Sequence, residues 1–107
     1  MKQTQSVAAV VEKTQTYIMK LYVSGDEQNS RLARVNLKDI CEEYLKDSYR
    51  IQEIDVLLDF VSALNDRVFV TPTLVLIEPE PKAIVIGNLN DKRKVVSTLR
   101  LKVEHGK

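Results

Sequence analysis

This chain has few residues of the types that catalyse reactions or bind metals, and their positions in the sequence form no known catalytic or metal-binding pattern. The only histidine, His105, lies beside Gly106 near the end of the sequence. A zinc or other transition-metal site needs several nitrogen or sulfur ligands, and no second soft ligand accompanies His105. A single histidine in the tail also leaves no Ser-His-Asp arrangement to argue for. We therefore predict no metal site and interpret His105 as a solvated tail residue.

The acidic residues and the glycines likewise form no catalytic pattern. Asp55 is expected at the end of a strand, and Asp66 in a turn that ends a helix, so neither indicates carboxylate chemistry together with Asp59. The three glycines do not form a phosphate-binding loop. We therefore expect no catalytic residue and no cofactor site, and the chain is predicted not to be an enzyme.

Cys41 is the only cysteine, so the chain has no Cys-x-x-Cys pair. It falls on the apolar stripe of an expected helix, and nothing near it would stabilise a thiolate, which favours a small buried core residue. An alternative stays open, namely a thioredoxin-fold stress protein with a residual redox role through Cys41. That alternative requires an exposed thiol with a lowered pKa.

The composition points to one globular domain without an obvious ligand class. The 107 residues include 16 lysines and arginines and 15 acidic residues, a net charge of +1. No stripe of basic and aromatic residues suggests nucleic acid, and no apolar run reaches the roughly 18 residues that a membrane span needs. The lone cysteine argues for a reducing compartment, so we expect a cytoplasmic protein. We divide the chain into an N-terminal tail (1–16), a domain (17–101) and a C-terminal tail (102–107).

The first half predicts a βαβ unit. Residues 17–23 are apolar on both faces, as in a central strand, and 50–57 alternate as a second strand. Between them, an apolar stripe with 3.6-residue spacing predicts a helix over 31–46, with Ser30 or Asn29 as the N-cap. A strand, a helix and a strand in this order should give a parallel, right-handed pair.

The second half continues the alternation. We expect a short helix from Leu57 to Leu64 ended by 65–67, strands over 73–77 and 83–86 joined by a Pro-rich turn, and a last helix from Asn90 that includes Val103. The order β-α-β-α-β-β-α predicts an α/β fold of the thioredoxin-like type. Pro72 interrupts the apolar stretch 68–77, and either a cis-proline corner or an ordinary trans-proline strand start fits the sequence.

Five blocks of sequence, in order and in register, carry a resemblance to a known family. They are Leu21-Tyr22-Val23-Ser24-Gly25 with Asn29-Ser30, Ile54-Asp55-Val56-Leu57, Thr71-Pro72-Thr73-Leu74, Pro79-x-Pro81, and Ile86-Gly87-Asn88-Leu89. From residue 17 to about 101 the chain resembles the KaiB family. The resemblance implies a non-enzymatic regulatory protein that binds a KaiC-like ATPase, in circadian timing or a related stress-adaptation system. Implied further partners are copies of the same chain, as a dimer or tetramer, and a histidine kinase that competes for the same site.

We place the implied contact surface on six residues. Arg31, Arg34, Arg67 and Lys82 are expected as rim charges, with Gln52 and Ile84 nearer the contact. For self-association we expect apolar surface around Tyr17, Leu57, Leu58 and Phe60 to be shared between chains.

The resemblance also implies two arrangements of the C-terminal half, one thioredoxin-like and one in a tetrameric ground state. Pro72, Pro79 and Pro81 all lie in that half, and proline isomerisation can make such a change slow. Thr98 and Arg100 replace a Gly and an Asp that are common in the family. We expect both to favour the last helix, Thr98 by its propensity and Arg100 through the helix dipole, and so to favour the thioredoxin-like state.

Overall fold

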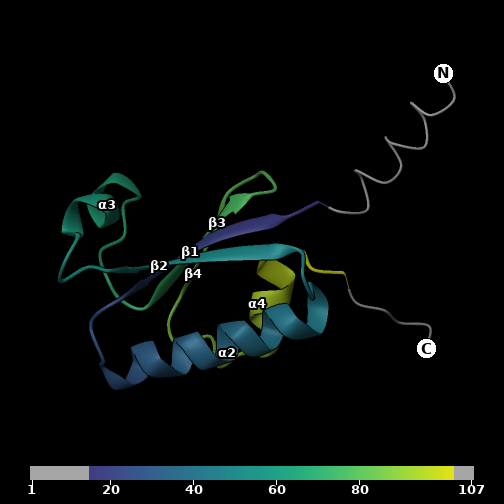
Figure 1. The fold of residues 1–107 in the computed structure, drawn as a ribbon, viewed down its shortest axis with the longest axis horizontal. Coiled ribbons are helices and arrows are strands. Elements are labelled where there is room, and N and C mark those ends of the chain that lie inside the picture. Colours follow the sequence, from purple (N-terminus) through teal and green to yellow (C-terminus); the bar gives the residue numbers. More distant parts are fainter. Residues whose placement is uncertain (1–14, 103–107) are drawn as a thin grey trace, which may run out of the picture.

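A computed structural model describes residues 15–102, which form one mixed sheet with three helices (Figure 1). The elements are β1 (Tyr17–Val23), α2 (Gln28–Tyr44), β2 (Tyr49–Asp55), α3 (Phe60–Asn65), β3 (Thr73–Glu78), β4 (Ala83–Ile86) and α4 (Lys92–Thr98). This is the predicted order β-α-β-α-β-β-α, and it confirms an α/β fold. His105, Val103 and most of the two predicted tails lie outside the described residues.

The sheet has the strand order β2-β1-β3-β4. The pair β1–β2 is parallel, with Tyr17 opposite Tyr49 and Val23 opposite Asp55. The pairs β1–β3 and β3–β4 are antiparallel. The parallel βαβ unit and the later hairpin are therefore both confirmed, and β1 is a central strand while β2 and β4 form the edges.

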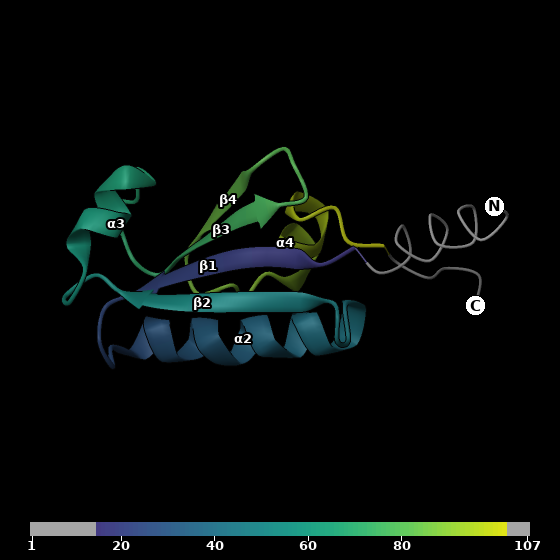
Figure 2. The same cartoon turned by 45° about the horizontal axis from the view of Figure 1, so that its top comes forward.

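One face of the sheet carries the main core. The helices α2 and α4 both cover this face, and Figure 2 shows α2 running along the sheet beneath β2 and β1. Successive residues of a strand point to opposite faces, so alternate residues of β1 and β3 enter this core. Its fully buried members include Met19, Leu21, Val23, Leu37, Leu74, Leu76 and Leu99.

Residues 15–102 cover the opposite face of the sheet only at one end. There α3 packs over a small second cluster made of Tyr22, Ile54, Ala63, Val68 and Val75. Both views show α3 at the end of the sheet where β1 and β2 finish (Figures 1 and 2). For the described part of the chain, the prediction that β1 is covered on both sides is thus right only near its C-terminal end, and residues 15–102 leave the rest of this face open.

The start of α2 differs from the prediction. Glu27, not Ser30 or Asn29, is the N-cap, and its carboxylate accepts from the backbone N–H groups of Asn29 and Ser30. Ser30 is instead buried inside the first turn, where its hydroxyl oxygen accepts from the N–H of Ser24 at 3.1 Å. A carboxylate satisfies the orphan donors of the first turn as a hydroxyl would, and its charge also suits the helix dipole.

The helices α3 and α4 are shorter than predicted and share one way of ending. Each starts after an aspartate N-cap, Asp59 for α3 and Asp91 for α4, so neither Leu57 nor Asn90 begins a helix. Each ends in a Schellman motif, in which the residue after the C-cap adopts a positive φ. These residues are Arg67, with φ 58°, and Arg100, with φ 57°.

Hydrogen bonds define these two ends. In α4 the N–H of Arg100 donates to Ser97 and the N–H of Leu101 donates to Val96, at 3.1 and 3.0 Å. The predicted place of Arg100 inside the last helical turn is therefore wrong, because the helix ends at Thr98 and Arg100 follows the C-cap. At both ends the apolar residue that follows the positive-φ residue is buried: Val68 after α3 and Leu101 after α4.

The three prolines flank β3: Pro72 precedes it, and Pro79 and Pro81 lie in the turn that joins it to β4. The Thr71–Pro72 bond is cis. Of the two arrangements that fit the sequence, the structure therefore has the cis-proline corner and not the trans-proline strand start. The bonds before Pro79 and Pro81 are cis as well. Pro72 is buried just ahead of β3, and its carbonyl oxygen accepts from the N–H of Gly87 at the end of β4.

Candidate partner-binding site

A row of four side chains crosses the open face of the sheet. Lys20 lies opposite Gln52 on β2 and opposite Val75 on β3, and Val75 lies opposite Ile84 on β4. Residues paired across strands point to the same side of a sheet, so this row presents one side chain from each strand. Two of the predicted contact residues, Gln52 and Ile84, are therefore on one surface.

Further isoleucines extend this row into an apolar face. Ile86 lies two residues beyond Ile84 on β4 and is 62% exposed, while Ile84 is 49% exposed. Ile18 on β1 and Ile77 on β3 share the same side and are half-buried. We call the surface formed by Ile18, Lys20, Gln52, Ile77, Ile84 and Ile86 the open face. Exposed apolar side chains gathered on one face of a sheet suit contact with another protein surface.

A polar cluster fixes α3 to one end of the open face. The Nζ atom of Lys20 lies 3.2 Å from Oδ2 of Asp66, at the C-cap of α3. The Tyr22 hydroxyl donates to the same carboxylate oxygen and lies 3.1 Å from the carbonyl oxygen of Ser62. Burial by itself would raise the pKa of Asp66, but the hydrogen bonds from Tyr22 and Lys20 outweigh burial and hold this pKa below its usual range. The ionised carboxylate thus joins β1 to α3.

Three predicted contact residues meet at a hollow beside this cluster. Arg67, Lys82 and Ile84 line an open cavity of about 410 Å³ between the end of α3 and the β3–β4 hairpin. The remaining lining residues are Asn65, Asp66, Val75 and Ala83. Within residues 15–102, neither Arg67 nor Lys82 forms an ion pair. The structure therefore places four predicted contact residues on one side of the sheet: Gln52 on β2, Ile84 on β4, Lys82 in the β3–β4 turn and Arg67 after α3.

The other two predicted contact residues lie elsewhere. Arg34 on α2 donates through Nε to Glu53 at 2.8 Å and through Nη2 to the carbonyl oxygen of Gly25 at 2.9 Å. Arg31 donates to the backbone and side chain of Asp26. Both arginines belong to the helix that covers the opposite face of the sheet, and both are engaged with their own domain.

A second, apolar surface surrounds α3. A groove of about 200 Å³ is lined by Phe60, Leu64, Phe69, Val70 and neighbouring residues. Leu57, Leu58, Phe60, Val61, Leu64, Phe69 and Val70 are all at least half exposed. Tyr17 lies at the other end of β1, where its hydroxyl donates to the carbonyl oxygen of Arg100. The predicted self-association surface is therefore two separate surfaces, because Leu57, Leu58 and Phe60 are far along the sheet from Tyr17.

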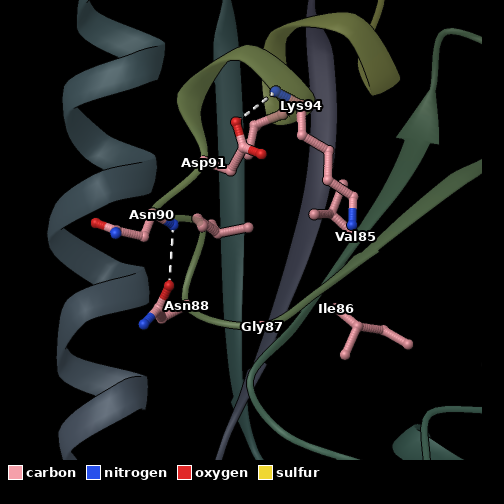
Figure 3. A pocket seen from close by; sticks show the side chains of 9 residues that line it. Val85, Ile86, Gly87, Asn88, Asn90, Asp91 and Lys94 are labelled. Atoms are coloured by element: carbon pink, nitrogen blue, oxygen red, sulfur yellow. Dashed lines mark hydrogen bonds between the residues drawn. The ribbon is translucent and has the colours of Figure 1, made fainter.

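A third hollow lies where β4 leads into α4 (Figure 3). It has a volume of about 300 Å³, and its polar groups are occupied within the loop. Asn88 accepts from the N–H of Asn90 at 2.9 Å, and Asp91 caps α4 by accepting from the N–H of Lys94 at 3.2 Å. The Nδ2 atom of Asn36 on α2 donates to the carbonyl oxygen of Asn88. These bonds fix the loop to α2.

The described residues offer little for redox or metal chemistry. Cys41 is fully buried, and burial, with a smaller contribution from Glu42, raises its pKa to about 12. The alternative of a redox role through Cys41 required an exposed thiol with a lowered pKa, and it is wrong on both counts.

Between residues 15 and 102 no group of three potential metal ligands is found. No helix in this part of the chain has the length and apolar character to cross a bilayer.

The Lys20–Asp66–Tyr22 cluster was missed by reasoning from the sequence. A signal was available, because Lys20 and Tyr22 both fall on one side of a strand that is otherwise apolar. A buried tyrosine hydroxyl usually has a hydrogen-bond partner. What the sequence does not state is that the partner is Asp66, 44 residues away.

The fold and its surfaces define a class of protein: a thioredoxin-like domain that lacks the dithiol and whose described residues leave one sheet face largely uncovered. The N-terminal domain of Synechococcus elongatus SasA has a similar structure, with a TM-score of 0.67 and 23% identity over 80% of this chain and 85% of that one. Mitochondrial thioredoxin 3 of Saccharomyces cerevisiae has a TM-score of 0.65 and 16% identity over 92% of this chain and 90% of that one. The thioredoxin-like fold predicted from the sequence is thereby confirmed.

Sequence comparison identifies the family. The KaiB domain model matches residues 20–101. The circadian clock oscillator protein KaiB of Rippkaea orientalis is 41% identical over 95 residues, which cover 89% of this chain and 91% of that protein. The protein of the same name from Prochlorococcus marinus subsp. pastoris is 44% identical over 86 residues, 80% of each chain. This chain belongs to the KaiB family, as the five sequence blocks predicted.

Proposed function

We propose that this chain is a non-enzymatic regulatory protein that binds a KaiC-type ATPase, in circadian timing or a related stress-adaptation system. Membership of the KaiB family and its clock-named relatives support the regulatory role. The observation that carries the binding proposal is the open face, on which Ile84 and Ile86 are exposed beside Gln52 and the hollow lined by Arg67 and Lys82. The proposal includes a cytoplasmic location for the chain.

The arrangement favours binding over catalysis. The only thiol is buried with a raised pKa, so it does not serve as a nucleophile at neutral pH. The exposed residues of the open face are instead Gln52, Ile84 and Ile86, which offer an amide and apolar side chains. Exposed apolar side chains gathered on one face suit contact with another protein.

Two further parts of the proposal concern other states and partners. A histidine kinase with a sensor domain of the same fold competes for the ATPase, which is supported by the likeness of this fold to the SasA N-terminal domain. The chain also associates with itself as a dimer or tetramer, and its C-terminal half has a second arrangement in that state. The apolar surface around α3 is the surface we assign to self-association.

The experiment that tests this function is co-elution. The full chain is mixed with the KaiC-type ATPase encoded in the same genome, with ATP or with ADP, and the mixture is separated by size exclusion. We expect the chain to elute with the ATPase in at least one nucleotide state. Separate elution in both nucleotide states, at concentrations well above micromolar, contradicts the proposal.

A further inference from the structure

The hollow beside α3 holds an unbalanced set of charges. Three cations, Lys20, Arg67 and Lys82, lie around one carboxylate, that of Asp66. Lys20 is ion-paired with Asp66, and the Tyr22 hydroxyl donates to the same carboxylate. The negative charge in the hollow is therefore already matched from inside the domain. Lys82 also acts on Asp66 electrostatically, but neither Lys82 nor Arg67 forms an ion pair within residues 15–102, so the hollow keeps an excess of positive charge.

The walls of the same hollow are aliphatic. Val75 is buried, while Ala83 is half-buried and Ile84 is 49% exposed. Ile86 and Ile18 continue the apolar surface on the open face. A small hydrated anion would gain nothing from these side chains. A carboxylate that arrives on an aliphatic protein segment would be matched both in charge and in apolar contact.

We propose that this hollow receives one acidic side chain of the partner, a glutamate or an aspartate, presented by an aliphatic segment that covers the open face. Arg67 and Lys82 neutralise the carboxylate, and Ile84 and Ile86 contact the neighbouring aliphatic residues. The proposal rests on the proposed function and specifies the chemistry of the ATPase surface that the open face recognises.

Charge alone does not distinguish a carboxylate from a phosphate group in this hollow, and the aliphatic walls are what favour a carboxylate carried by a protein segment. Asp66 repels an added anion while the cations attract it, and both effects grow with the charge of the ligand. A carboxylate brings one charge, while a phosphate monoester brings nearly two at neutral pH. The two cations can compensate one added carboxylate and still leave the hollow with an excess of positive charge.

The backbone conformation of Arg67 permits substitutions that change only the charge of its side chain. Arg67 has φ 58° at the end of α3, a conformation that any unbranched L-residue adopts at about the same cost. Replacements of Arg67 by glutamine and by glutamate therefore differ in charge, while the free-energy cost of the positive φ stays about the same. Lys38, exposed on α2 on the opposite side of the sheet, supplies a control position.

The test measures binding of the full chain to the KaiC-type ATPase of the same genome. Two double variants are compared, R67Q with K82Q and R67E with K82E, with Lys38→Glu as the control. We expect the neutral pair to weaken binding by about tenfold or more and the reversed pair to weaken it further, with a lower association rate. Wild-type affinity should fall as salt is raised, and the neutral pair should show a smaller salt dependence. Circular dichroism checks that all variants are folded.

Several outcomes overturn the proposal. If wild type binds the ATPase and both double variants bind within about twofold of Lys38→Glu, the hollow receives no acidic side chain and the proposed function stands. If inorganic phosphate displaces the chain more than sodium chloride does at equal ionic strength, the hollow takes phosphate and the proposal is wrong. If wild type itself does not bind, the proposed function fails and the hollow loses its assigned partner.

The origin of the carboxylate is tested by a charge exchange. Surface glutamates and aspartates of the ATPase are replaced singly by lysine, and each variant is combined with the R67E/K82E chain. We expect one such replacement to restore binding to the reversed chain while weakening binding to wild type. Failure of every replacement to do so overturns the proposal.

Discussion

The Nη2 atom of Arg100 lies 3.0 Å from the carbonyl oxygen of Pro81 and 3.2 Å from that of Pro79. One guanidinium thus connects the end of α4 to the turn between β3 and β4. The same residue has φ 57°, a left-handed conformation in which an L-residue other than glycine is disfavoured. Arg100 therefore stabilises the domain through its side chain and destabilises it through its backbone.

Two substitutions at Arg100 separate these effects. Arg100→Ala keeps the left-handed backbone but removes the contacts to the turn, and we expect it to lower the free energy of unfolding by roughly 1 kcal/mol. Arg100→Gly removes the same contacts but also removes the backbone cost, so it should be more stable than Arg100→Ala by about 1 kcal/mol. Urea unfolding measures both. If Arg100→Ala equals wild type, the contacts to Pro79 and Pro81 contribute nothing.

The balance between two folds is tested by the double change Thr98→Gly with Arg100→Asp. The expected outcome is a lower population of the thioredoxin-like state, as the sequence predicts. The physical reason for Arg100 is different from the one first inferred, since an aspartate would lose the hydrogen bonds to the turn and face its carbonyl oxygens. NMR of residues 68–102 reports the populations. A higher thioredoxin-like population in the double variant contradicts this explanation.

The Asp66 cluster predicts a pH dependence of stability. Because the pKa of Asp66 is lower in the folded than in the unfolded chain, its ionised form contributes stability above the unfolded pKa of about 4. That contribution is lost as the pH falls through the lower, folded pKa. We expect Asp66→Asn to be less stable than wild type at pH 7 by about 1–3 kcal/mol, with a smaller difference near pH 3. Equal differences at both pH values would show that the carboxylate charge is not involved.

Cys41 should behave as a packed core residue. With a pKa raised to about 12, its thiol stays neutral up to strongly alkaline pH. We expect a thiol reagent such as DTNB to label the folded protein far more slowly than the protein in urea, and Cys41→Ser to destabilise the domain by about 1–3 kcal/mol. Labelling of the folded chain at the unfolded rate would contradict burial and restore the redox alternative.

Self-association should depend on the surface around α3. Leu58 is 86% exposed, so its replacement by glutamate costs the monomer little, while it places a charge in any interface that covers α3. Static light scattering at micromolar concentration should give a dimer or tetramer for wild type and a smaller species for Leu58→Glu. Val35→Glu, at an exposed residue of α2, is the matched control. A strictly monomeric wild type would remove this part of the proposal.

Much of the fold follows from the sequence because strand and helix periods are local. The apolar residues 17–23 predicted β1, and the apolar stripe that includes Ala33, Leu37 and Ile40 predicted α2 with its buried face. The helix ends were less predictable. The end of α3 lies at residues 65–67, as predicted, but Arg100 occupies a position where glycine is usual, so no local signal marked the end of α4.

The binding site could be predicted in part. Gln52 and Ile84 fall on one face once the strand register is known, and register depends on pairing between distant strands. The proximity of Arg67 to Lys82 depends on how α3 packs against the hairpin, and that packing depends on the tertiary contact between Asp66 and Tyr22. Arg31 and Arg34 were grouped with these residues on charge alone, and charge does not specify a face.

The measurement that tests the central claim most directly compares two exposed apolar positions on opposite sides of the sheet. Affinity for the KaiC-type ATPase is measured for wild type, for Ile84→Asp on the open face and for Val35→Asp on α2. In the wild-type structure Ile84 is 49% exposed and Val35 is 58% exposed. We predict that Ile84→Asp weakens binding by more than about tenfold, because it places an unpaired charge in the contact, and that Val35→Asp leaves binding unchanged. The opposite result, loss of binding for Val35→Asp and wild-type affinity for Ile84→Asp, would place the contact on α2 with Arg31 and Arg34 and contradict the account.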